Sequence, residues 1–305
     1  MAKLFDVTKE GKGVSREQVN KRKGFMLFLD IYFRRFWKLV LLNLIYMIVS
    51  IPAIFVSYKF VQYALVFYMQ FAGIRPDNTE AVREAIRLTP VLMAILIQFC
   101  GAGPATAGFC NVLRKYVNDR HAWVWADFVR GMKENWKQSL AVYLINMAYM
   151  VFATGSFLFY KYLMPDMQIL SVVIFTGSLA FLMMQMYTYQ LMVGFRLTLK
   201  ELYKNSAILT IIKLPTNIGV AFVSTMLLYF MCTLAVSVPP AMLMFTFIIT
   251  MLVFFSVVTL AQMFMTRRII QKYLIDTAKE NPGKKQNGEY DIEDKDEEFE
   301  EIFED

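Results

Sequence analysis

The sequence predicts an all-α membrane protein: a polytopic helix bundle with about six spans, interfacial amphipathic helices and a disordered acidic C-terminal tail. Composition is the first observation, because 57% of the 305 residues are hydrophobic and only 19% are charged, far from soluble averages. The second is that five segments run without charge over the ~20 residues needed to cross a bilayer. The third is an alternation of positive charge between the connecting segments.

These observations place the spans at residues 36–57, 88–113, 139–160, 168–195, 218–238 and 242–264. Pro239 and Pro240 mark the turn between the last two. The connecting segments are alternately rich and poor in Lys and Arg, which resist translocation, so we expect both termini in the cytoplasm. Asp30, Arg34 and Arg35 interrupt the first short apolar run, which argues against a cleaved signal peptide.

Three regions follow from this assignment. Residues 1–35 form a cytoplasmic N-terminal segment with an interfacial helix, residues 36–273 form the six-span domain, and residues 274–305 form a cytoplasmic tail. Residues 1–288 carry 31 basic and 14 acidic side chains, whereas residues 289–305 carry one basic and 11 acidic. The basic body suits anionic lipid headgroups without any nucleic-acid partner. The tail is expected to be disordered, and either docks on the basic body or stays solvated.

Two cytoplasmic segments have aromatic stripes at helical spacing that end close to an apolar span. The residues expected at headgroup depth are Phe28, Trp37, Trp125, Phe128 and Trp136. A third segment, 196–213, precedes the fifth span with a poorer match. The segments are either three repeats of one interfacial-helix-plus-hairpin unit or independent products of the preference of Trp and Tyr for the interface.

Residues 58–73 prolong the first apolar run but include polar side chains. Joined to the first span they would make a helix of ~55 Å, too long for one crossing. We therefore expect this segment to project outside the membrane.

Small residues interrupt the second expected span. They are Gly101, Gly103, Pro104, Ala105, Ala107 and Gly108. Helices in lipid associate where small side chains let their backbones approach, so the favoured interpretation is close helix packing around a proline kink. The alternative is a broken helix that lines a substrate cavity, as in transporters.

Residues with catalytic or cofactor chemistry are scarce. The chain has one histidine and no P-loop, G-x-S-x-G or H-E-x-x-H motif, so we expect no enzyme activity, no metal and no cofactor. The polar cluster Gln185, Tyr187, Tyr189 and Gln190 in the fourth span is the best candidate for a site for a neutral polyol. The alternative for these residues is interhelical hydrogen bonding.

The string GPATAGFCNVLRKYVNDRHAWVWADFVRGMKENWKQS, with RFWKLVLLNLIYMIVSIP before it, resembles the YesL-like family of uncharacterised bacterial integral membrane proteins. About forty residues, 55–95, intervene where family members pass almost directly to the second motif, which puts the transfer of their span count in doubt. The resemblance implies a bacterial plasma membrane and a supporting role in sugar uptake, beside carbohydrate transporter subunits or a membrane sensor.

We therefore expect a non-enzymatic integral membrane protein that assists or regulates another membrane system. The alternative is an autonomous transporter or channel for a neutral solute.

Overall fold

The computed structural model describes residues 25–71, 73, 101–118, 120–160, 164–237, 255–267 and 269–270. Every regular element in these ranges is a helix, and no strand occurs among them. The helices are α1 (Phe25–Arg34), α2 (Phe36–Val49), α3 (Ile51–Phe71), α5 (Pro104–Val117), α6 (Val124–Glu134), α7 (Trp136–Leu158), the short 3-10 turn η2 (Pro165–Met167), α8 (Ile169–Gly194), α9 (Leu199–Ile212) and α10 (Leu214–Ser237). Residues 255–267 form a further helical segment.

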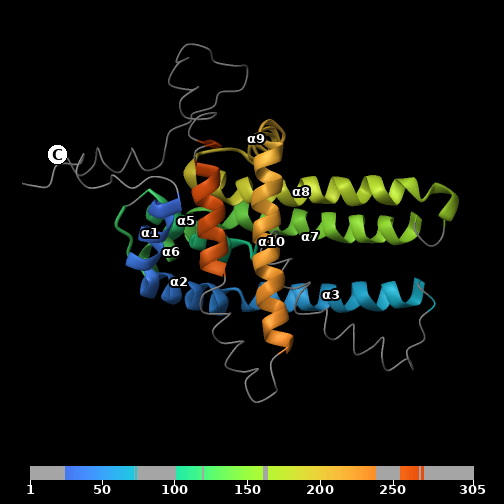
Figure 1. Ribbon diagram of the computed structural model, residues 1–305, viewed down its shortest axis with the longest axis horizontal. Helices are drawn as coiled ribbons and strands as arrows, with labels where there is room; N and C mark the ends of the chain where they lie inside the picture. Colours follow the sequence, from blue (N-terminus) through green and yellow to red (C-terminus); the bar gives the residue numbers. More distant parts are fainter. Residues whose placement is uncertain are drawn as a thin grey trace, which may run out of the picture.

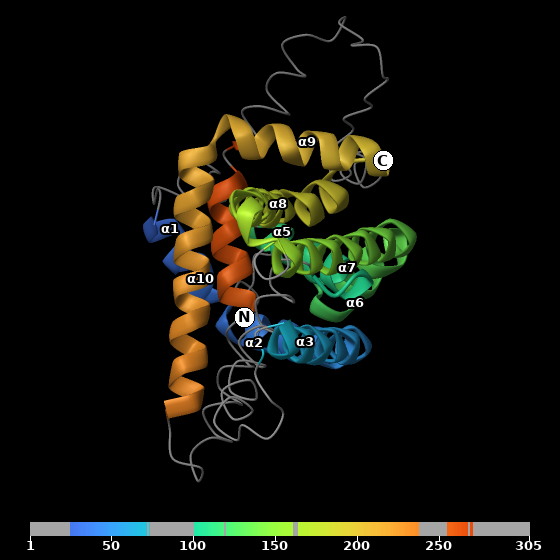
Figure 2. The same ribbon diagram turned by 90° about the vertical axis from the view of Figure 1, so that its right-hand side faces the viewer.

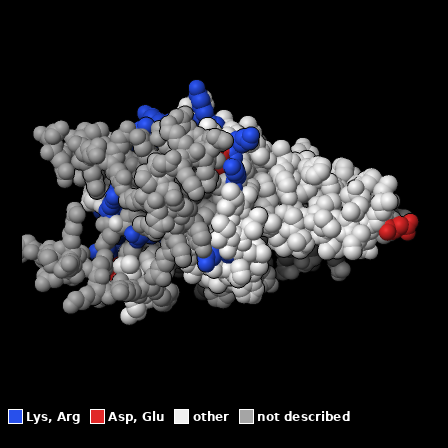
Figure 3. Space-filling view, turned by 90° about the horizontal axis from the view of Figure 1, so that it is seen from above, with Lys and Arg blue, Asp and Glu red and all other residues white. Residues whose placement is uncertain are grey.

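Helices α3, α7 and α8 lie side by side and form one end of the molecule, which we call the arm (Figures 1 and 2). Each is long and apolar enough to cross a membrane. Helix α8 has no charged residue, while α3 has only Lys59 and α7 only Lys137. The surface of the arm is therefore almost free of charge up to its tip (Figure 3), where η2 carries Asp166.

Helices α1, α2, α5, α6 and α9 gather at the other end, which we call the head (Figure 1). Lys and Arg are concentrated over the head and its junction with the arm (Figure 3). The head and the base of the arm share one hydrophobic core, built on fully buried side chains such as Leu42, Phe109, Tyr116, Phe128 and Leu202. The molecule is thus divided into an apolar end and a basic end.

Three helix pairs bend at a single residue with similar backbone geometry. Arg35 between α1 and α2 has φ −114° and ψ 14°, Asn135 between α6 and α7 has φ −111° and ψ 14°, and Lys213 between α9 and α10 has φ −120° and ψ 37°. The last pair turns by 97°. These bends fall where the sequence places its three interfacial segments, so the geometry favours repetition of one unit.

The expected count of six spans is not confirmed. Among the described residues, three helices could cross a membrane, or four if the bent pair α9–α10 counts as one span. The first expected span is divided at Ser50, and α3 continues to Phe71 as one helix, so residues 58–71 extend a candidate span instead of forming a separate segment. The other described candidates, α7 and α8, overlap the spans expected at 139–160 and 168–195.

Several expectations lie outside the described residues. They concern residues 88–100, the Pro239–Pro240 turn, most of the span at 242–264, and the terminal segments 1–24 and 271–305.

Candidate functional site

The small-residue segment begins a helix instead of kinking one. Residues 101–103 are not helical, and Pro104 is at the first position of α5, where its missing N–H costs no hydrogen bond. Gly101 and Gly103 have φ of +74° and +61°, in the left-handed region that favours glycine. A Cβ on Gly101 would lie 2.7 Å from the Tyr189 ring, so this turn is pressed against α8.

The close packing expected of this segment is divided: Gly101 and Gly103 lie against the candidate spans α8 and α7, whereas Gly108 lies against α6. A Cβ on Gly108 would lie 2.5 Å from the main-chain oxygen of Phe128, and one on Gly131 would lie 2.5 Å from the Cβ of Asn111. Ala105 and Ala107 are buried in the same core. Glycines on both helices thus allow α5 and α6 to form a tight hairpin.

An ion pair and hydrogen bonds stabilise this hairpin. The buried Asp127 pairs with Lys115, with 3.0 Å between Nζ and Oδ1, and accepts a hydrogen bond of 2.8 Å from the main-chain N–H of Trp123. Asn111 Nδ2 donates to the main-chain oxygen of Asp127 at 2.8 Å. Sequence reasoning missed these roles. The available sequence signal for Asp127 was its place shortly after AWVW, where an acidic residue suits the first turn of a helix.

The residues expected at headgroup depth divide into two groups. Trp37, Trp125 and Trp136 are at least half exposed, and so is Trp123, so all four tryptophans lie at the surface. Phe28 is partly buried against Phe264, at 5.8 Å between ring centroids. Phe128 is fully buried because α5 covers that face of α6. Periodicity finds the stripe, but neighbouring helices decide which part of it faces outward.

Inside the molecule, neutral polar side chains connect the helices. Asn146 on α7 donates to Gln185 on α8 at 3.1 Å, and Tyr203 on α9 donates to Asn146 at 3.2 Å. Tyr187 on α8 donates to Asn217 on α10 at 2.5 Å. Such interhelical bonds contribute about 0.6 kcal/mol each on average.

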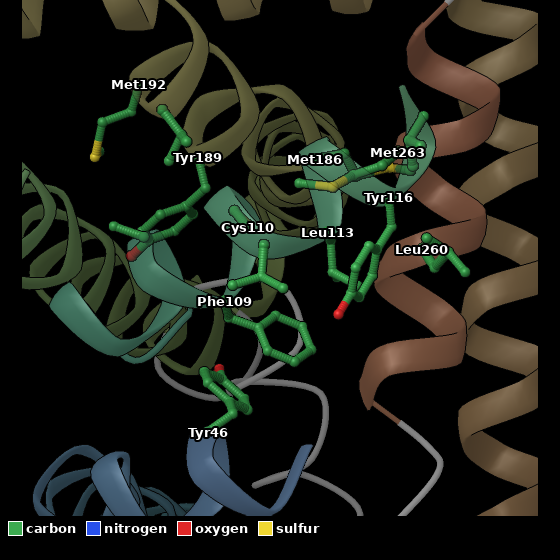
Figure 4. Packing of buried hydrophobic residues seen from close by; sticks show 14 of the residues in the cluster. Tyr46, Phe109, Cys110, Leu113, Tyr116, Met186, Tyr189, Met192, Leu260 and Met263 are labelled. Atoms are coloured by element: carbon green, nitrogen blue, oxygen red, sulfur yellow. The ribbon is translucent and has the colours of Figure 1, made fainter. Parts of the chain in front are cut away.

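Three of the four residues in the expected polar cluster line one cavity of about 30 Å³. Gln185, Tyr189 and Gln190 come from α8, whereas Tyr187 is engaged by Asn217 elsewhere. Figure 4 shows other helices that meet here, with Tyr46 from α2 and Cys110 from α5. The remaining lining residues are Thr106, Phe109, Met186, Phe255, Thr259 and Gln262. Sequence reasoning missed Thr106, Thr259 and Gln262, which lie far from the cluster in the chain.

Four buried side-chain polar atoms are unsatisfied among the described residues: the hydroxyls of Ser50, Ser57 and Tyr116, and Gln185 Nε2. Gln185 Nε2 has no hydrogen-bond partner, although its Oε1 accepts from Asn146. The Tyr116 hydroxyl has none either, and the Arg35 guanidinium lies 4.6 Å from the centre of the Tyr116 ring. Burial raises the pKa of Tyr116 to about 12, because the charged form would lose its hydration. No cluster of potential metal ligands occurs in the part of the chain that the structure describes.

The α5–α6 hairpin and α7 lie within a residue range that matches a known family model. Residues 88–162 match the model described as "Protein of unknown function, DUF624". The chain contains a DUF624 domain. This is the family commonly called YesL-like, so the match falls on the string that carries the resemblance. No curated protein and no solved structure is significantly similar to the chain. The described part of this range contains the tight hairpin of the head and one helix of the arm.

Proposed function

We propose that this chain is a non-enzymatic integral membrane protein that assists or regulates another membrane system, with carbohydrate uptake as the candidate. The observation that carries the proposal is the division of the molecule into an arm almost free of charge and a basic head with exposed tryptophans. Trp favours headgroup depth, and Lys and Arg attract anionic lipid at about 1 kcal/mol each. Transporter subunits or a membrane sensor are the candidate partners, from the likeness to YesL-like proteins.

The dimensions and charges support the membrane placement. Helix α8 has 26 residues, and at 1.5 Å per residue it is ~39 Å long, enough for a hydrocarbon core of ~30 Å. We place the arm in a bacterial plasma membrane, with the head and both termini in the cytoplasm, because Lys and Arg resist translocation.

An autonomous transporter or channel for a neutral solute is the second candidate, favoured by the neutral polar lining of the cavity. A cavity of about 30 Å³ has room for roughly two water molecules. A sugar does not fit in this conformation, so transport requires a second conformation in which the lining helices separate.

The test combines purification and flux. Transporter subunits or a sensor are expected to co-purify with the protein from cross-linked native membranes. Replacing the exposed Lys133 and Lys137 beside the tryptophans by Glu should weaken this capture. The same charge change at the exposed Lys200 and Lys204 on α9 is the matched control. Liposomes containing only this protein should take up labelled glucose or sorbitol no faster than empty liposomes, and faster uptake would overturn the proposal.

A further inference from the structure

We propose that the cavity between α2, α5, α8 and residues 255–267 is a binding site for a small uncharged guest that accepts a hydrogen bond from Gln185. The guest has the size of one or two water molecules. This site is inside the molecule and does not depend on the proposed role at the membrane surface.

Hydrogen bonds that run from Tyr203 through Asn146 to Gln185 determine which atom of the Gln185 amide, Oε1 or Nε2, remains for a guest. Tyr203 donates to Asn146 Oδ1 at 3.2 Å, and Asn146 Nδ2 donates to Gln185 Oε1 at 3.1 Å. The oxygen of Gln185 is therefore engaged on α7, and Nε2 is the end of the amide that remains for a guest in the cavity that Gln185 lines. Gln185 is only 3% exposed, so this donor is buried without a partner among the described residues.

A buried donor without a partner is destabilising, so a guest that accepts from Nε2 is favoured over an empty cavity. The residues that line the cavity carry no charged side chain. A charged guest would be desolvated without compensation, and an apolar guest would leave Nε2 unsatisfied. Thr259 and Gln262, which also line the cavity, offer further polar groups from residues 255–267. These conditions select a neutral molecule with a hydroxyl or carbonyl oxygen, and water is the smallest that meets them.

Two substitutions of the buried, cavity-lining Cys110 test whether the site is occupied. Cys110→Val adds a methyl group and displaces a guest, whereas Cys110→Ser retains the space and adds a polar group. If the site is occupied, Cys110→Val should unfold at a lower temperature than the parent. Cys110→Ser should then unfold at a higher temperature than Cys110→Val. In an empty site the order reverses, because filling a dry cavity stabilises and a buried hydroxyl costs.

Gln185→Met provides the matched background, because it retains length and removes the amide. The penalty of Cys110→Val should shrink in this background, since the Nε2 donor is gone and the loss of the Asn146–Gln185 hydrogen bond is common to both variants that are compared. Unfolding of these purified full-length variants is followed by far-ultraviolet circular dichroism in detergent. The reversed order of the two Cys110 variants overturns the proposal.

A map from electron cryomicroscopy that resolves ordered water provides a measurement independent of folding. Density within hydrogen-bonding distance of Gln185 Nε2 is expected, and an empty cavity in a map showing other buried waters overturns the proposal. Formamide distinguishes the source of the guest. Stabilisation by formamide of the parent but not of Cys110→Val identifies a small carbonyl solute, whereas equal responses identify water.

Discussion

Gly108→Ala tests the packing of the DUF624 hairpin with the smallest possible change. The added Cβ would lie 2.5 Å from the main-chain oxygen of Phe128, whereas ordinary contact begins at 3.4 Å, so α6 must retreat by about 1 Å. Main chain cannot rotate away as a flexible side chain can, and the Lys115–Asp127 ion pair and the Asn111 hydrogen bond oppose the shift. Overpacking costs about 1–3 kcal/mol, while Ala in place of Gly gains about 1 kcal/mol of helix propensity.

We therefore expect a net loss of up to about 2 kcal/mol of stability at this position. Gly155→Ala and Gly177→Ala are the matched controls, because both lie in helices and a Cβ there meets no atom within 4 Å. These controls should be unchanged or more stable by up to about 1 kcal/mol. Thermal unfolding in detergent can be followed with a thiol-reactive dye, since Cys110 is buried until the protein unfolds. If Gly108→Ala unfolds at or above the temperature of both controls, the close-approach argument is wrong.

Three further predictions follow from the structure. Tyr116→Phe should stabilise the protein by about 1 kcal/mol, because it removes an unsatisfied buried hydroxyl, whereas Tyr46→Phe loses the contact with Thr106 and should destabilise by a similar amount; equal thermal shifts would contradict this. An impermeant thiol reagent added to intact cells should label Asp166→Cys at the tip of the arm but not Lys133→Cys on the head, and the opposite pattern would reverse the proposed orientation. A peptide of residues 289–305 should bind the protein lacking this tail at low salt and release as salt rises, and no binding at low salt would leave the tail without a docking role.

Length and apolarity were sufficient to find α7 and α8, because a charge-free run of more than twenty residues has few stable states other than a buried or spanning helix. They were not sufficient for the first apolar run. Hydropathy cannot distinguish one span followed by a projecting segment from two helices divided at Ser50. The number of spans therefore depends on where each helix ends, and hydropathy gives little information on helix ends.

The candidate site shows the same limit at the level of single residues. The chain alone identified a neutral polar cluster on α8, and three of its four members line the cavity. Which of them face it was decided by partners distant in sequence: Asn217 engages Tyr187, and Asn146 determines the orientation of the Gln185 amide. Small residues were likewise recognisable as packing residues, but α6 as the partner of Gly108 was not.

The sequence by itself determined that this protein is helical, apolar over long runs, basic between them and acidic in its last 17 residues, because those properties are sums over local residues. Only the tertiary structure decided which face of each helix is covered, which glycine meets a backbone and which amide lacks a partner. The physical reason is that α8, like α7, has almost no amphipathic pattern. With apolar residues all round a helix, the buried face is chosen by the shapes and hydrogen bonds of neighbouring helices.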